Sequence, residues 1–167
     1  MTREEQNVFL SEGYREALRY MDNAKEALQK SQKDDHYYKD SKYVKAACGI
    51  AYSGVLVALD AWFQLKEVTS PRKSLRKSVD FYKGNIYKLD KKMSDRFNTA
   101  YEVLHLVGYY DGERRIKTIQ SGFEVAYEII ERIKPEELVE VKESRVKEAK
   151  RILNGLFILF STTVKRG

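Results

Sequence analysis

The stretch YVKAACGIAYSGVLVALDAWF, residues 43–63, decides the fold class of this chain. Asp60 is the only charged residue between positions 46 and 63, so a helix formed here is apolar on nearly every side. A helix with this pattern is typical of the centre of a bundle. We therefore expect a central helix over about residues 41–66. Its small residues predict that a neighbouring helix approaches closely: Ala47, Ala51, Gly54 and Ala58.

Amphipathic patterns lie on both sides of this stretch. Apolar residues recur every three or four positions over residues 11–30, and Ser11 is the expected N-cap. The run 75–107 keeps one apolar stripe with a mean spacing of about 3.6 residues, the period of an α-helix. One long helix and two helices broken near residues 90–95 both fit this stripe, and Ser94, as a second N-cap, favours the break.

Two further helices are expected over residues 113–133 and 135–165, and the polar segment 31–40 is expected to be a loop. The sequence thus predicts an all-α, up-and-down bundle of five or six antiparallel helices with a C-terminal helix appended. We expect a single domain over residues 1–167, with its core at about 11–133.

Composition excludes several classes of protein. The chain has 167 residues, of which 43% are hydrophobic and 34% are charged, with only 9 Gly and 2 Pro. These values suit one helical domain and argue against a turn-rich all-β fold or a disordered protein. One Cys excludes a disulfide framework, and no apolar run predicts a signal peptide or a membrane span. We expect a cytoplasmic protein with no cofactor and no membrane association.

Positive charge is concentrated in one part of the sequence. The net charge is +6, and residues 64–96 alone hold ten basic and four acidic residues. Such a segment attracts polyanions such as RNA, or simply forms a solvated helix face. The candidate nucleic-acid-binding residues are Arg72, Lys73, Arg76, Lys77 and Lys83.

The candidate site with the most chemistry is RFNTAYEVLHLVGYYDGERR, residues 96–115. On a helix, Asn98, Tyr101 and His105 share one flank of the apolar stripe, and Glu102 lies within reach of His105. A histidine beside these groups suits general acid–base chemistry, whereas a histidine that only borders the core is the alternative.

The end of the same stretch offers further candidate binding residues. Tyr109 and Tyr110 lie in the GYYDG segment, where we expect a turn that ends the helix. Arg114 and Arg115 stand at the start of the next helix, where they would hold an anion with the free backbone N–H groups or form an ordinary surface pair. No spacing of Cys, His, Asp or Glu predicts a metal site.

Residues 14–133 resemble the HEPN-like helical proteins, an uncharacterised small bacterial branch above all. The resemblance rests on the Ala-rich helix, the basic helix after it and the motif RFNTAYEVLHLVGYYDG. It implies an up-and-down bundle, a homodimer, and either an RNase with an R-x4-6-H motif or a non-catalytic binding module beside a partner such as a nucleotidyltransferase. In this sequence the nearest equivalents are Arg96 and His105, which form R-x8-H.

Nine residues on a straight helix turn through about 900°, so Arg96 and His105 are predicted to face opposite sides. We therefore expect a non-catalytic HEPN-like module that binds a protein or RNA and self-associates. Two alternatives stay open. One is a metal-independent, toxin-type RNase that uses His105 with an Arg, and the other is a structural homodimer built on the C-terminal helix and its apolar stretch at 152–160.

Overall fold

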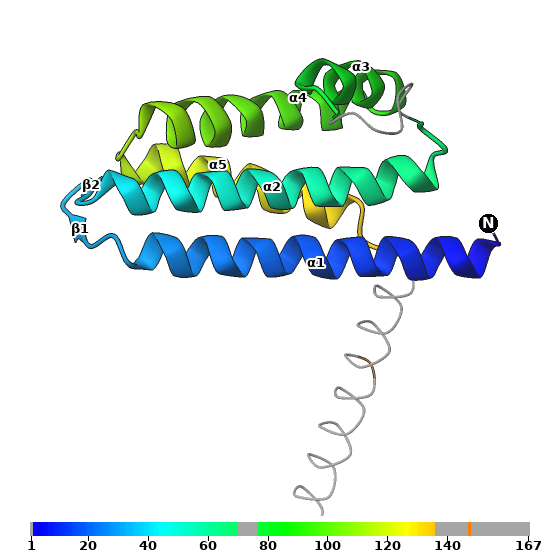
Figure 1. Ribbon diagram of the computed structural model, residues 1–167, viewed down its shortest axis with the longest axis horizontal. Helices are drawn as coiled ribbons and strands as arrows, with labels where there is room; N and C mark the ends of the chain where they lie inside the picture. The colour runs from blue at the N-terminus through cyan, green and yellow to red at the C-terminus, as the bar shows by residue number, and fades with distance from the viewer. Residues whose placement is uncertain (1, 70–76, 136–146, 148–167) are drawn as a thin grey trace, which may run out of the picture. The chain divides into compact units, whose positions relative to one another are not determined.

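A computed structural model gives the fold and describes residues 2–69, 77–135 and 147. Over these residues the chain is an all-α bundle of five helices packed antiparallel, with α4 and η1 taken as one continuous helix (Figure 1). The predicted fold class is confirmed. The elements are α1 (Arg3–Gln29), β1 (Lys33–Asp34), β2 (Tyr37–Tyr38), α2 (Ser41–Leu65), α3 (Val79–Leu89), α4 (Lys91–Ala100), η1 (Tyr101–Asp111) and α5 (Ile116–Arg132).

The chain divides into two compact units, Met1–Ile133 and Lys134–Gly167. All the helices and strands above belong to the first unit. The C-terminal helix predicted over 135–165, including the apolar stretch at 152–160, falls almost wholly outside the described residues. A single domain over residues 1–167 stays a prediction.

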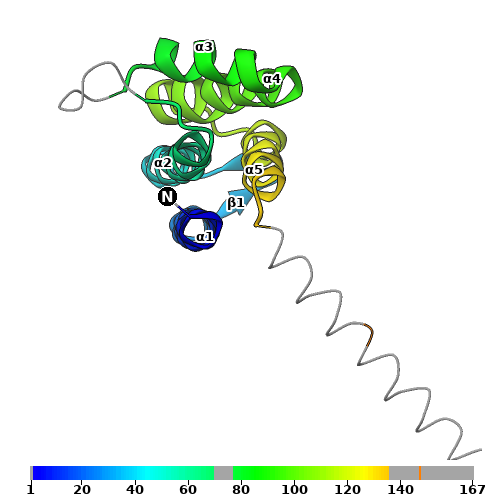
Figure 2. The same ribbon diagram turned by 90° about the vertical axis from the view of Figure 1, so that its right-hand side faces the viewer.

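Helix α2 lies at the centre of the bundle, with α1 on one side and η1 on the other (Figure 2). Val44, Ala51 and Leu59 of this helix expose no surface. An 18-residue window of α2 is long and apolar enough to cross a membrane, but 61% of that window is buried inside the bundle. Burial in the core therefore accounts for the apolar character of α2.

Small residues bring α1 and α2 together, as the sequence predicts for Gly54. A Cβ atom added at Gly54 would lie 3.2 Å from the carbonyl oxygen of Ala17. A Cβ atom added at Gly13 would lie only 2.3 Å from the Cβ of Ala61. The backbones of the two helices therefore approach at two places, and larger side chains at either glycine would push them apart.

Helix α1 begins earlier than the apolar pattern predicts. Its N-cap is Thr2, which accepts a hydrogen bond from the Glu5 N–H at 3.2 Å, while the Glu5 carboxylate accepts from the Thr2 N–H at 2.7 Å. This is a capping box. Ser11, the expected N-cap, instead lies inside the helix and is buried. The prediction was wrong because the apolar stripe fades towards the N-terminal end of α1. The capping box, and not the stripe, fixes the start of the helix.

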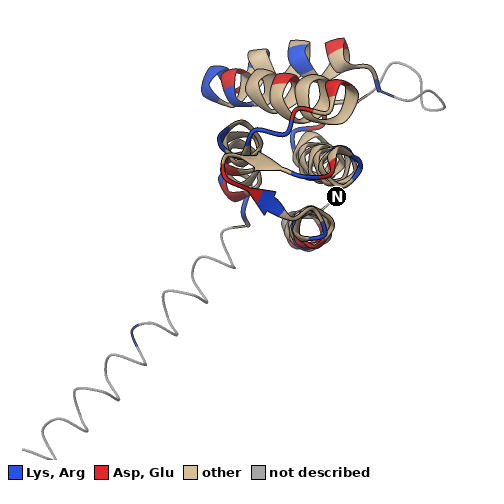
Figure 3. Cartoon of the chain, turned by 90° about the vertical axis from the view of Figure 1, so that its left-hand side faces the viewer, with Lys and Arg blue, Asp and Glu red and all other residues tan. Residues whose placement is uncertain are grey.

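A small hairpin replaces the loop predicted between the first two helices, and Figure 3 views the bundle from this end. Strands β1 and β2 pair antiparallel, and Asp35 makes the turn with a φ of 49°. The hairpin is anchored to the segment before α5 because the Tyr38 N–H donates to the Arg114 carbonyl and the Ile116 N–H donates to the His36 carbonyl. Backbone pairing with a distant segment gave no local signal in the sequence.

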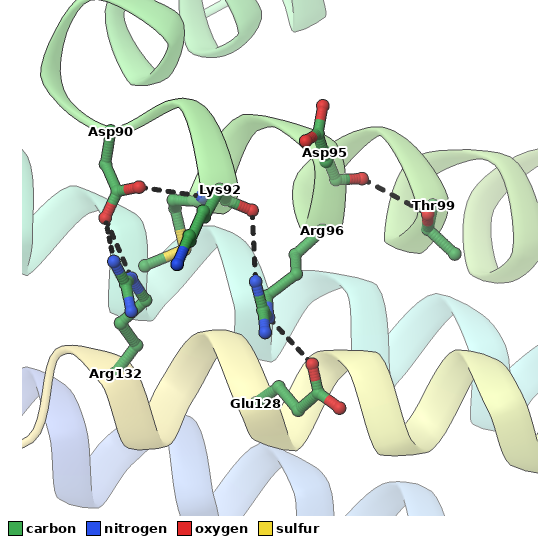
Figure 4. A network of polar contacts seen from close by, with 8 residues as sticks. Asp90, Lys92, Asp95, Arg96, Thr99, Glu128 and Arg132 are labelled. Carbon is green, nitrogen blue, oxygen red and sulfur yellow. Dashed lines mark hydrogen bonds and ion pairs between the residues drawn. The ribbon is translucent and has the colours of Figure 1, made fainter.

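The break predicted within residues 75–107 exists, but Asp90 makes it. Asp90 has an extended backbone, with φ −157° and ψ 106°, so it ends α3 and caps α4. Its Oδ1 accepts from the Met93 N–H at 3.0 Å, and its Oδ2 accepts from Arg132 Nε at 2.8 Å (Figure 4). Although burial opposes the charged form, these partners hold the pKa of Asp90 below its usual value. Ser94, the predicted cap, is buried inside α4.

Candidate functional site

The helix that carries most of the predicted site is a π-helix. Helix η1 continues α4 from Tyr101 to Asp111, and Gly112 ends it with a φ of 74°. The Gly112 N–H donates to the carbonyl of Val107, five residues earlier, which is the π-helical pattern. π-Helical segments are rare, are usually a single turn, and occur frequently at functional sites. An 11-residue segment of this kind marks η1 as a candidate site.

Aromatic rings stack along one side of η1, and we call Tyr101, His105, Tyr109 and Tyr110 the aromatic face. The centroids of Tyr101 and His105 are 5.3 Å apart at 29° between planes, and those of His105 and Tyr109 are 5.9 Å apart at 13°. Tyr110 meets His105 edge-on at 5.2 Å. Tyr109 is 44% exposed and Tyr110 is 61% exposed, so the outer rings of this face are open to solvent.

Tyr52 of α2 supports the aromatic face from the inside. Its ring is 8% exposed and stacks on His105 with the centroids 4.8 Å apart. It also lies 6.0 Å from the ring of Tyr101. The His105 ring is thus held among tyrosines from two helices, and its position is fixed by the core.

Glycines allow η1 to lie close to its neighbours. A Cβ added at Gly108 would lie 2.5 Å from Cys48 Sγ, and one added at Gly122 of α5 would lie 2.7 Å from Leu104 Cδ2. Gly49 lies under the ring of Tyr109, whose Cδ2 would be 3.0 Å from an added Cβ. This contact places the Tyr109 ring against α2, and 44% of the residue's surface stays exposed.

A lysine lies at each end of the aromatic face. Lys83 of α3 places its Nζ 4.7 Å from the centroid of the Tyr101 ring. Lys45 of α2 donates from its Nζ to the backbone carbonyl of Tyr110 at 2.8 Å. Both ammonium groups are therefore held by specific contacts beside the rings, and Lys83 makes a cation–π contact.

Arg96 and His105 contact different helices. The Nε of Arg96 donates to Glu128 Oε2 of α5 at 2.7 Å, and its Nη1 donates to the Lys92 carbonyl at 3.3 Å (Figure 4). His105 instead stacks on Tyr52 of α2. Of the three side chains predicted to share a flank, Tyr101 and His105 are in contact and Asn98 is exposed; Glu102, predicted to lie within reach of His105, is exposed too.

The backbone N–H groups before α5, which were predicted to bind an anion, donate instead to the carboxylate of Glu113. Glu113 Oε1 accepts from the N–H groups of Arg114 and Arg115, both at 2.8 Å. The Arg115 N–H, joined by that of Arg114, holds the pKa of Glu113 below its usual value. Arg114 also donates from Nη1 to the Lys39 carbonyl at 3.2 Å, so it helps to anchor the hairpin.

The predicted nucleic-acid-binding lysines have different surroundings. Lys77 is half-buried and donates to Asp60 Oδ1 at 2.7 Å, so its charge is neutralised locally. Lys83 lies over the Tyr101 ring, at one end of the aromatic face. In the view of Figure 3, basic and acidic residues are interspersed over the helices. The other predicted residues lie outside the described part of the chain: Arg72, Lys73 and Arg76.

Two residues of the site were missed in the sequence. Tyr52 and Lys45 precede η1 by about fifty residues in the chain, and Tyr52 is one of many apolar positions in residues 43–63. Tyr109 and Tyr110 were predicted to lie in a turn, but they lie inside η1. No group of three metal-binding side chains occurs in residues 2–69 and 77–135.

The fold and this site define an all-α helical-bundle protein with an exposed aromatic surface. The chain belongs to the family described as domain of unknown function (DUF5618), which residues 12–135 match. A solved structure described as a protein of unknown function from Dyadobacter fermentans is similar. It is 43% identical in sequence, with a TM-score of 0.65 over 74% of this chain and 94% of that chain. Comparison with curated proteins gave no match.

Proposed function

We propose that this chain is a non-catalytic, HEPN-like helical module that binds single-stranded RNA through the aromatic face. The observation that carries the proposal is the stack of Tyr101, His105 and Tyr109, with Tyr110 exposed beside it and a lysine at each end. Single-stranded nucleic acids are bound by the same combination, in which bases stack on rings and cations follow the backbone.

Each part of the aromatic face has a role in this proposal. Tyr109 and Tyr110 offer ring surface for bases, and Lys83 and Lys45 lie where phosphates would pass. Base stacking on an aromatic ring is worth about 1–3 kcal/mol per base. Because phosphate contacts release counterions, the affinity should fall as salt rises.

The contacts of Arg96 support binding without cleavage. The R-x8-H spacing and the ion pair of Arg96 with Glu128 keep this guanidinium on the α5 side, while His105 stacks on α2. A metal-independent RNase that uses His105 with an Arg is the alternative function. Cleaved RNA in the binding assay would favour it.

The HEPN resemblance also supports self-association and a protein partner such as a nucleotidyltransferase, in a cytoplasmic protein without membrane association. A homodimer is part of our proposal, and sedimentation of the full chain tests it. The alternative homodimer built on the C-terminal helix predicts that a chain ending at Lys150 is monomeric.

The experiment that tests RNA binding is fluorescence anisotropy with labelled single-stranded RNA at low and moderate salt. Tyr110→Ala should weaken binding about fivefold to a hundredfold, the equivalent of one lost stack. Tyr110→Phe keeps the ring and should bind almost as the wild type does. Lys83→Ala should reduce the salt dependence, whereas Lys30→Ala, on the exposed C-cap of α1, should not.

A denaturing gel of the same samples shows whether the RNA stays intact. Wild-type protein that fails to bind at low salt would refute the proposal. Equal losses in the Ala and Phe variants of Tyr110 would also contradict it, because stacking would then not be the source of affinity.

A further inference from the structure

A groove of about 650 Å³ lies between α1 and the C-terminal half of α2. The residues that line it come from these two helices, from the segment after α2 and from Lys77, so it shares no residue with the aromatic face. Its floor is apolar. The floor residues are Phe9, Val57, Ala61 and Val68.

The floor is shaped by the contact between Gly13 and Ala61, the closest approach of the two helices that we describe. An added Cβ at Gly13 would lie 2.3 Å from the Cβ of Ala61, so neither residue projects into the groove. Phe9, Val57 and Val68 are only half-buried and leave apolar surface facing it. A concave apolar surface between two helices suits the side chains of a third helix.

The rim of the groove is acidic on both sides. Four acidic residues and one lysine line it. Two of the carboxylates have partners, because Glu16 pairs with Arg19 and Asp60 pairs with Lys77. Glu12, on α1, and Glu67, just beyond α2, are exposed and form no ion pair within the described residues.

We propose that this groove binds a cationic amphipathic helix of a partner protein. The apolar side chains of such a helix, spaced three and four residues apart, would fill the floor. Lysines or arginines on its two flanks would meet Glu12 on one rim and Glu67 on the other. The charge of the rim selects this occupant, because an acidic helix or an RNA backbone is repelled by the same carboxylates.

The test uses the full chain and a fluorescein-labelled synthetic helix of about five turns, with a leucine stripe flanked by lysines. A second peptide replaces the lysines with glutamates, and a third keeps the lysine composition but scrambles the leucine spacing. The rim variant is Glu12→Lys with Glu67→Lys. The matched control is Glu26→Lys with Glu124→Lys, which changes the net charge equally at exposed positions outside the groove.

We expect the wild type to bind the lysine-flanked helix and to bind the scrambled peptide at least about tenfold more weakly. The rim variant should lose at least about tenfold in affinity for the lysine-flanked helix and should gain affinity for the glutamate-flanked one. The control variant should bind as the wild type does, and circular dichroism should show all three proteins folded.

Several results would overturn the proposal. One is wild-type protein that does not bind the lysine-flanked helix, and another is equal binding of the scrambled peptide. Equal loss in the control variant would show attraction by net charge alone. If sedimentation shows a wild-type dimer that the rim variant converts to a monomer, a second copy of this chain occupies the groove instead.

Discussion

Asp90 should stabilise the bundle in two ways that mutations can separate. Its Oδ1 caps α4 through the Met93 N–H, and its Oδ2 pairs with Arg132 Nη2 at 2.6 Å. Loss of an N-cap costs about 1 kcal/mol. The ion pair is partly solvated, with Arg132 43% and Asp90 21% exposed, so it is worth about 0.5 kcal/mol after solvent screening.

Three variants divide these contributions. Asp90→Ala removes both and should lower the free energy of unfolding by about 1.5 kcal/mol. Asp90→Asn keeps a good N-cap but loses the charge, so it should cost about 0.5 kcal/mol. Arg132→Ala should cost about as much as Asp90→Asn. Urea denaturation at neutral pH measures all three.

The ion pair should also make stability depend on pH. The pKa of Asp90 is lowered in the folded chain, so its carboxylate contributes full stability above the unfolded pKa of about 3.9. This contribution is lost as pH falls through the lower, folded pKa. The difference between the wild type and Asp90→Asn should therefore shrink in that acidic window.

The reasoning is refuted if Asp90→Asn costs as much as Asp90→Ala, because the cap would then contribute nothing. It is also refuted if the difference between wild type and Asp90→Asn grows as the pH falls. A double-mutant cycle with Arg132→Ala provides the control, and its coupling energy should match the ion-pair contribution.

Three further predictions concern single positions. Gly108→Ala should lower stability by about 1–3 kcal/mol, since its Cβ would lie 2.5 Å from Cys48 Sγ, and Cys48→Ala in the same chain should restore part of that loss in urea denaturation. Glu67→Gly should raise the free energy of unfolding by up to about 1 kcal/mol, because Glu67 follows the C-cap of α2 with a φ of 55°; a loss of stability in urea denaturation would show that its left-handed backbone carries no cost. Burial raises the pKa of Cys48 to about 12, so iodoacetamide should label this thiol only after unfolding, and rapid labelling of the native protein would contradict its buried position.

The sequence predicted what depends on the spacing of apolar residues. Residues 43–63 are so poor in charge that only a central helix fits them, and α2 extends from Ser41 to Leu65. The break in the run 75–107 was also predicted within a few residues. Its cap was not, because Asp90 and Ser94 are both good N-caps locally. The choice depends on Arg132, which lies about forty residues away and neutralises Asp90.

The aromatic face depends on packing that local periodicity does not encode. A spacing near 3.6 describes the stripe through residues 75–107 equally well with or without a π-helix. Gly108 lies on Cys48, and Gly122 faces Leu104, so the course of η1 depends on contacts with two other helices. Tyr109 and Tyr110 are consequently helical residues, although their GYYDG context is typical of a turn.

Helix α2 contributes residues to both candidate surfaces, but from different halves of the helix. Its N-terminal half supplies Lys45 and Tyr52 to the aromatic face, whereas its C-terminal half supplies Val57 and Ala61 to the groove. The aromatic face has a lysine at each end, and the groove has two exposed carboxylates on its rim, Glu12 and Glu67, that form no ion pair within the described residues. Under our two proposals, a polyanion would be attracted to the aromatic face and repelled by the groove, and a cationic helix would show the opposite preference. If both proposals hold, the same electrostatics would prevent competition between the two ligands, and one small bundle would hold an RNA strand and a protein helix together.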